Sequence, residues 1–172
     1  MDTVATPLSR NNIRVFANFI RNKLGVTNQL KFPICQFLER IPDILNNPNF
    51  YYRIIPDNNL PKDIHAFYTL YDDAIYIKES VYNGACADKG RDRMTIAHEI
   101  GHYLLIKTNG LQLQRHFNNT SIPTYMSPEW QAKCFGGELL IPAHLIKGMQ
   151  PAEIAEKCKV SLDAAKYQLS RI

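Results

Sequence analysis

The spacing of apolar residues predicts two helices in the first third of the chain. In residues 9–25 apolar side chains recur every three or four positions behind Ser9, a good N-cap. A second helical pattern covers residues 33–45, and Pro42 within it predicts a kink or a split. Residues 1–8 show no pattern, and we expect a loose tail.

The middle of the chain changes to a pattern typical of β-structure. Aromatic and β-branched residues predict strands at 51–55, 66–71 and 74–78, the last two joined by a tight turn. Residues 79–93 are polar and are expected to be irregular. We expect a small antiparallel sheet packed against the helix that follows.

Further helices are predicted in the second half. One covers residues 94–110, and another runs from Ser127 as N-cap to Ile141, where Pro142 ends it. The segment 111–128 between them is loop-like. The fold class is therefore α+β and mostly helical. We divide it into one domain, residues 1–150, and a tail of two short helices, residues 151–172.

Composition narrows the class of protein. The 172 residues are 45% hydrophobic and 21% charged, with a formal net charge of +4 spread along the chain. These values are ordinary for a globular protein and permit, but do not indicate, a nucleic-acid partner. No apolar run is long enough to span a membrane, and no secretory signal is recognisable, so we expect a cytoplasmic protein with reduced cysteines.

The predicted helix at 94–110 carries the sequence His98-Glu99-Ile100-Gly101-His102, which reads H-E-x-x-H. Residues four apart share one helix face, so the two imidazoles can converge on one zinc ion. Glu99 lies one position round the helix, within reach of a water on the metal. Burying such groups without partners is costly, which favours a metal site over histidines without a chemical role.

A catalytic zinc site needs a third protein ligand. In the metzincin pattern a glycine and a third histidine follow the second histidine, but Leu105 and Thr108 occupy those positions. The other class takes a glutamate from a second helix, for which Glu129 and Glu138 are the candidates. They are nine residues apart and lie on opposite sides of one helix, so only one of them can face the metal.

Two blocks of the sequence resemble the ImmA/IrrE-type zinc metallopeptidases, a family of bacterial and phage proteins. Residues 91–105 resemble the family's core. A second family block, E-x-x-A-[ND]-x-F-A-x-x-L-L-x-P, is matched by Glu129, Ala132, Phe135, Leu139, Leu140 and Pro142. The family's metal-binding glutamate is the first residue of that block. The resemblance therefore assigns the third ligand to Glu129.

The resemblance also implies a zincin-like domain and a chemistry. His98, His102 and Glu129 would hold Zn, and Glu99 would act as general base and then general acid. The expected activity is a gluzincin-like endopeptidase, and the expected partner is a helix-turn-helix repressor from a mobile genetic element or a stress system. Tyr125 is the candidate for stabilising the oxyanion.

His116 and His144 are alternatives for the oxyanion role, and the sequence does not rank them against Tyr125. The hairpin before the active helix offers an edge, residues 74–78, to which an extended peptide could add.

A departure from the family pattern at Lys133 and the pattern of the C-terminal tail each open an alternative. Lys133 stands where relatives carry Asn or Asp, and a lysine cannot accept a hydrogen bond from a zinc-bound histidine. This favours, as an alternative, a catalytically weak or inactive metal-binding sensor that binds a partner. The tail at 154–161 is similar to a helix-turn-helix with Lys159 at the turn glycine, so a DNA-binding regulator is a third hypothesis, although we expect no nucleic-acid partner.

Overall fold

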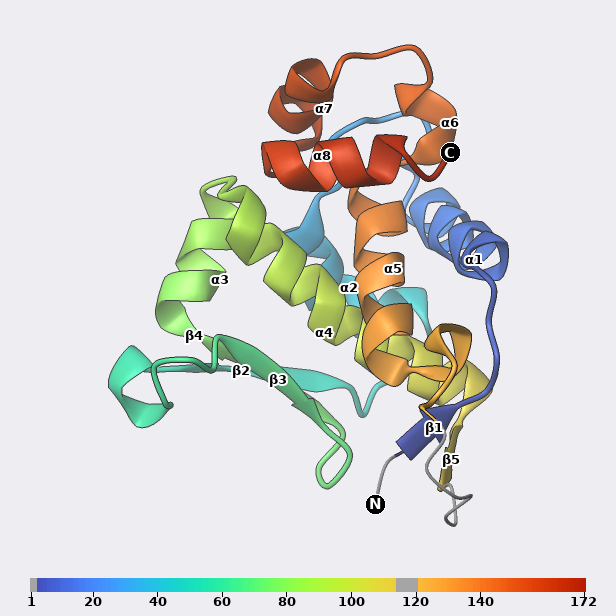
Figure 1. Cartoon of the computed structure of the whole chain (residues 1–172). Helices are drawn as coiled ribbons and strands as arrows, with labels where there is room; N and C mark the ends of the chain where they lie inside the picture. Colours follow the sequence, from blue (N-terminus) through green and yellow to red (C-terminus); the bar gives the residue numbers. More distant parts are fainter. Residues whose placement is uncertain (1–2, 114–120) are drawn as a thin grey trace.

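The computed structural model describes residues 3–113 and 121–172, and its central element is helix α4 (Gly90–Asn109). Helix α5 (Pro128–Leu140) packs along α4, and α1 (Arg10–Lys23) packs on the other side of α5. A small sheet lies against α4 at the opposite end from the C-terminal helices (Figure 1). The molecule is α+β and mostly helical, as the sequence predicts.

Local capping signals place α1 and α5 where the sequence predicts them, whereas α4 has no side-chain cap and begins at Gly90, before the predicted start at residue 94. Ser9 and Asn12 form a capping box before α1. Ser127 accepts a hydrogen bond from the backbone N–H of Trp130 at the start of α5. Helix α2 (Ile34–Ile44) contains Pro42 without splitting.

The central sheet is mixed, so the expected antiparallel sheet is wrong. Strands β3 (Ala66–Thr69) and β4 (Ala74–Lys78) form the predicted antiparallel hairpin, but β2 (Tyr51–Ile55) pairs with β4 in parallel. The connection at 56–65, which includes the short 3₁₀ helix η1 (Asp57–Asn59), carries the chain past β4, and the strand order is β2-β4-β3. A parallel pair requires such a crossover.

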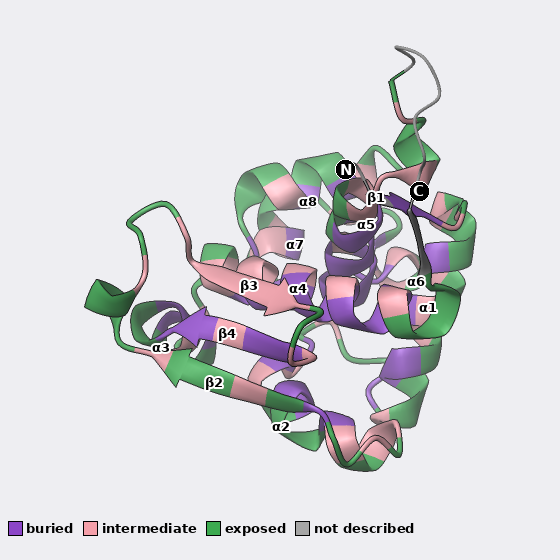
Figure 2. Cartoon of the chain, turned by 90° about the horizontal axis from the view of Figure 1, so that it is seen from below, coloured by how far each residue is buried: buried purple, intermediate pink, exposed green. Residues whose placement is uncertain are grey.

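The central position of β4 determines which edge of the sheet an extended peptide could join. Ala74, Ile75 and Ile77 of β4 are fully buried, and Figure 2 shows this strand between its two neighbours. The predicted binding edge at 74–78 is therefore wrong, because both sides of β4 are already paired. The edge beside α4 belongs to β3.

Two segments expected to be irregular contain regular structure. Strand β1 (Thr3–Ala5) pairs antiparallel with β5 (Leu111–Leu113), in place of a loose tail and part of a loop. Helix α3 (Glu79–Cys86) occupies half of the stretch predicted to be irregular. A polar helix of two turns gives little periodic signal, and strand pairing across a hundred residues gives none in the local sequence.

The C-terminal segment forms α6 (Ala143–Ile146), α7 (Pro151–Cys158) and α8 (Leu162–Leu169). The last two are the predicted short helices about a turn. Lys159 adopts the left-handed conformation, with φ 56° and ψ 55°, that a glycine would favour. Arg93, only 1% exposed, donates hydrogen bonds to the carbonyls of Lys159 and Phe32. This guanidinium ties the tail to α4; the division into residues 1–150 and 151–172 stays a prediction.

The hydrophobic core lies between these helices and the sheet. Fully buried side chains from most of the helices and from β4 form it, among them Ile13, Phe37, Ile75, Ile96, Ile100, Phe135 and Leu139. One side of helix α4 packs into this core, and its burial there fixes the rotation of the helix about its own axis. In the described ranges, no helix has the length and apolar character needed to cross a membrane.

Candidate metal centre

Three side chains from α4 and α5 converge on one point. Nε2 of His98 lies 3.1 Å from Nε2 of His102, and Glu129 places one carboxylate oxygen 3.2 Å from the first and the other 3.0 Å from the second. The possible ligand atoms of the three residues all lie within 4.8 Å of one another. Two imidazoles and a carboxylate are a donor set that zinc takes in catalytic sites, so the residues fit the ion that the sequence predicts.

Gly101 allows α5 to approach α4 closely enough for this convergence. A Cβ at Gly101 would lie 3.0 Å from the carbonyl oxygen and 3.1 Å from the Cα of Ala132 on α5. Backbone atoms cannot move aside as a flexible side chain can, so a larger residue would push the helices apart. The sequence signal for this contact was the glycine inside the H-E-x-x-H motif.

The second candidate for the third ligand, Glu138, lies elsewhere. Its carboxylate is buried and forms ion pairs with Arg10 at 3.0 Å and Arg14 at 2.9 Å. Two arginines on α1 thus bind the acceptor oxygens of this carboxylate. The geometry brings Glu129, and not Glu138, to the two histidines.

Burial favours the neutral form of both histidines. It lowers the pKa of His98 to about 4, and the neighbouring His102 lowers it further. Burial is also the main cause that lowers the pKa of His102. Lys133 adds to both shifts through its charge, whereas Glu129 opposes them. A neutral imidazole is the form that binds a metal ion.

Glu99 is held beside the histidines by the edge of the sheet. Its side chain is 11% exposed, and Oε1 lies 4.0 Å from Nε2 of His98. Oε2 accepts a 2.9 Å hydrogen bond from the backbone N–H of Tyr68 in β3. Burial raises the pKa of Glu99 to about 7, and the Tyr68 hydrogen bond opposes the rise. The sequence did not reveal Tyr68, because a backbone N–H carries no residue-type signal.

Within the described residues, no hydrogen bond joins a predicted oxyanion stabiliser to His98 or His102, so this role stays a prediction. Tyr125 lies in the 3₁₀ helix η2 (Thr124–Met126), is 50% exposed, and engages Gln131 through its backbone carbonyl. In the described ranges its hydroxyl has no hydrogen bond. His144 bonds the carbonyl of Thr27 instead, and His116 lies outside the described residues.

Lys133 is exposed on α5, one turn after Glu129, and its charge reaches both histidines. An ammonium group has donors only, so it cannot orient an imidazole by accepting its N–H. That Lys133 leaves the zinc-bound histidines without an acceptor at this position stays a prediction.

The geometry agrees with the comparison to known families. A family model described as the IrrE N-terminal-like domain, Peptidase_M78, matches residues 59–170. The chain belongs to this family. Comparison with curated proteins gives no match. Membership in Peptidase_M78 makes the chain a metallopeptidase, which implies a metal cofactor and a protein substrate. It confirms the resemblance stated from the sequence.

Proposed function

We propose that this member of Peptidase_M78 is a zinc-dependent endopeptidase of the gluzincin type. His98, His102 and Glu129 would hold the zinc ion, and Glu99 would be the general base. The observation that carries the proposal is the convergence of two histidines from α4 and one glutamate from α5 within 4.8 Å, with Glu99 beside them.

When bound, zinc supplies a Lewis acid that polarises the scissile carbonyl and lowers the pKa of water. Glu99 takes the proton of the attacking water and passes it to the leaving amine. The Tyr68 N–H holds Oε2, so Oε1, the oxygen nearer to His98, is free to carry that proton. The low exposure of Glu99 limits the water around its carboxylate, and the Tyr68 hydrogen bond keeps that carboxylate in one orientation.

Strand β3 would bind the substrate backbone. It is the edge strand beside α4, and its Tyr68 N–H already points at Glu99. An extended peptide that pairs with the neighbouring outward groups of β3 would lie across the histidines. The scissile bond would then meet Glu99 without a further rearrangement.

The proposed substrate is a regulatory protein, most simply a helix-turn-helix repressor of a bacterial mobile genetic element or stress system. The family resemblance supports this choice. The test is to incubate the zinc-loaded protein with the repressor encoded beside it and to follow cleavage by mass spectrometry. Glu99→Gln should retain zinc and lose cleavage, whereas Glu79→Gln, an exposed glutamate on α3, should cleave normally. Cleavage by Glu99→Gln would overturn the proposal.

Lys133 favours a second candidate function, a metal-binding sensor that associates with a partner without cutting it. Its charge disfavours protonation of both histidines and it offers them no acceptor. The two functions differ in one measurement. A protein that binds one equivalent of zinc and its partner, yet cleaves no peptide in a diverse peptide library, is a sensor.

A further inference from the structure

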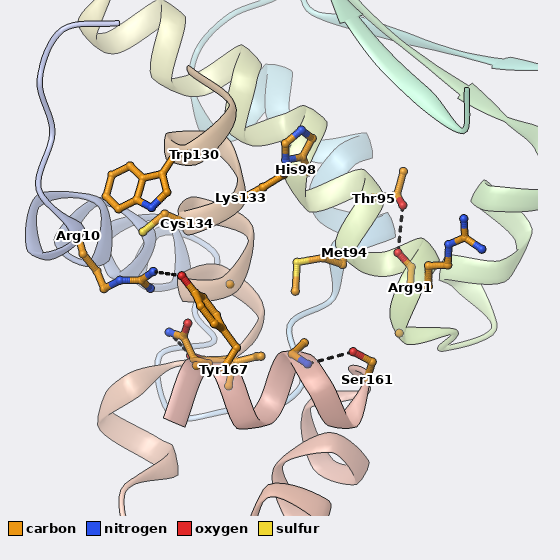
Figure 3. A pocket seen from close by; sticks show the side chains of 15 residues that line it. Arg10, Arg91, Met94, Thr95, His98, Trp130, Lys133, Cys134, Ser161 and Tyr167 are labelled. Carbon is orange, nitrogen blue, oxygen red and sulfur yellow. Dashed lines mark hydrogen bonds between the residues drawn. The ribbon is translucent and has the colours of Figure 1, made fainter. Parts of the chain in front are cut away.

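A cavity of about 710 Å³ opens beside His98, bounded by α4, α5 and α8. Figure 3 shows His98 towards one end, and Ser161 and Tyr167 of α8 towards the other. A volume of this size lies within the range of ligand-binding pockets, about 300–1,000 Å³. Because His98, one of the proposed metal ligands, lines the cavity, the cavity adjoins the proposed metal centre.

Apolar side chains form much of the wall. Met94 from α4, Trp130 and Ile141 from the region of α5, and Ala164 from α8 all line the cavity. Moving apolar surface of a ligand from water onto such a wall is favourable by about 25 cal/mol per Å². The wall therefore selects for large aliphatic or aromatic side chains.

The charged groups that line the cavity are all of one sign. Among the residues that the structure describes, Arg10, Arg91 and Lys133 line it, and no Asp or Glu does. Arg10 is neutralised by Glu138 at 3.0 Å. Within the described residues, neither Arg91 nor Lys133 has a carboxylate within 4.0 Å, although Arg91 contacts Nε2 of His65 at 2.8 Å. Two cations without a counter-charge attract acidic groups of a ligand.

We infer that this cavity is the pocket that selects the substrate. It takes a large apolar side chain next to the scissile bond, while acidic residues of the same segment meet Lys133 and Arg91. The inference rests on the proposed function and adds the substrate class: a protein segment that is apolar and acidic. Lys133, which departs from the family pattern, is then a specificity residue of this chain.

The test uses peptides of equal length that differ at two kinds of position. One position carries either a large apolar residue or serine, and the neighbouring charged positions carry either aspartate or lysine. Binding is measured by fluorescence polarisation with zinc-loaded Glu99→Gln protein, and cleavage by mass spectrometry with the unchanged protein. We expect the apolar, acidic peptide to bind at least about tenfold more tightly than its lysine counterpart, and the difference to shrink at high salt.

The two readouts separate the inference from the proposed function. Selective binding without any cleavage would overturn the proposed endopeptidase activity but would still support the inferred binding pocket. Cleavage or binding without preference for apolar and acidic peptides would overturn the pocket. Absence of binding by every peptide, with tight binding of the small anionic amphiphile decanoate, would overturn it as well, because the occupant would then be a small molecule.

Two variants test the assigned residues. Lys133→Glu should lower the ratio of acidic to basic peptide binding by about fivefold or more, since one attractive pair becomes repulsive. The matched control is Lys166→Glu, the same charge change on α8 outside the cavity lining, which should leave the ratio unchanged. Ala164→Phe should fill part of the cavity and reduce the preference for peptides with a large apolar side chain. If Lys133→Glu leaves the ratio of acidic to basic peptide binding unchanged, Lys133 is not a specificity residue.

Discussion

The backbone N–H of Tyr68 in β3 donates a 2.9 Å hydrogen bond to Oε2 of Glu99 in α4. This bond joins the edge strand, which would bind the substrate, to the proposed general base. It has a direct electrostatic effect, because a donor to a carboxylate favours the charged form and so opposes the rise in pKa that burial imposes on Glu99. The strand and the base are therefore positioned together.

Removing that donor should slow catalysis. Tyr68→Pro deletes the N–H, and proline is tolerated on an edge strand where the N–H does not pair with a neighbouring strand. Tyr68→Ala deletes the same ring, which contacts Tyr103, but keeps the N–H. We expect kcat for peptide cleavage to fall about tenfold further in the proline variant than in the alanine variant, because Glu99 loses its fixed orientation. Equal rates would show that the hydrogen bond has no catalytic effect.

The third ligand can be tested by metal content. Glu129→Gln should weaken zinc binding strongly, because it replaces a charged oxygen donor with a neutral amide. The measurement is a competition titration against a zinc chelator with a spectroscopic readout. Glu156→Gln, an exposed glutamate on α7, is the control and should retain full affinity. If both variants bind zinc like the unchanged protein, Glu129 is not a ligand.

Lys133→Asn restores a residue usual in the family. It removes a positive charge that repels a bound cation and adds an oxygen that can accept a hydrogen bond. We expect zinc affinity to rise by up to about tenfold, the scale of such supporting contacts. Lys147→Asn changes the charge equally at an exposed position outside the cavity lining. Unchanged affinity in Lys133→Asn would remove the main ground for the sensor hypothesis.

Gly101→Ala should destabilise the fold and disturb the metal centre. The added Cβ would meet backbone atoms of Ala132, so α4 and α5 must separate at a cost of about 1–3 kcal/mol. Gly136→Ala is the comparison on the same pair of helices, because its nearest atom is the flexible Sδ of Met94 at 3.2 Å. Urea unfolding followed by circular dichroism measures both. A smaller loss in Gly101→Ala than in Gly136→Ala would contradict the role of this contact.

The ion pair between Lys31 and Asp88 predicts a dependence of stability on pH. The hydrogen bond from Lys31, at 2.7 Å, is the main cause that lowers the pKa of Asp88 below its usual 3.8. A folded-state pKa below the unfolded one gives stability that is present above about pH 4 and is lost as the pH falls through the folded value. Since both groups are partly exposed, we expect less than about 1 kcal/mol.

Asp88→Asn tests this dependence with little change in backbone preference, because asparagine also tolerates the positive φ of 63°. Unfolding free energies measured by urea titration at pH 3 and pH 6 should differ less in the variant than in the unchanged protein. A difference of the same size in both would show that Asp88 does not contribute to acid sensitivity.

The sequence predicted the parts of the molecule that depend on neighbours along the chain. Ser9 and Ser127 mark helix starts because capping acts within one turn, and His98 and His102 share a face because they are four residues apart. The mixed sheet was missed because the partner of β4 depends on a crossover that no local pattern encodes. The short helix α3 was missed because its sequence is too brief and polar to show a period.

The candidate site also has parts that the sequence predicts and parts that it does not. Glu129 could be chosen over Glu138 only through the family block, because spacing excludes their joint use but does not say which one faces the metal. The cavity could not be predicted, because residues from both ends and the middle of the chain line it. Tyr68 contributes a backbone group, which any residue type would provide at that place.

The contact of Arg10 with both Glu138 and Tyr167 joins α1, α5 and α8 at one guanidinium. Arg10 donates to Oε1 of Glu138 and, at 3.2 Å, to the hydroxyl of Tyr167. The three proposed metal ligands all precede α6, whereas one wall of the cavity comes from α8. Deleting α8 would therefore take Ala164 and Tyr167 from that wall and the Tyr167 hydroxyl from Arg10, while the sequence that carries the proposed ligands stays intact.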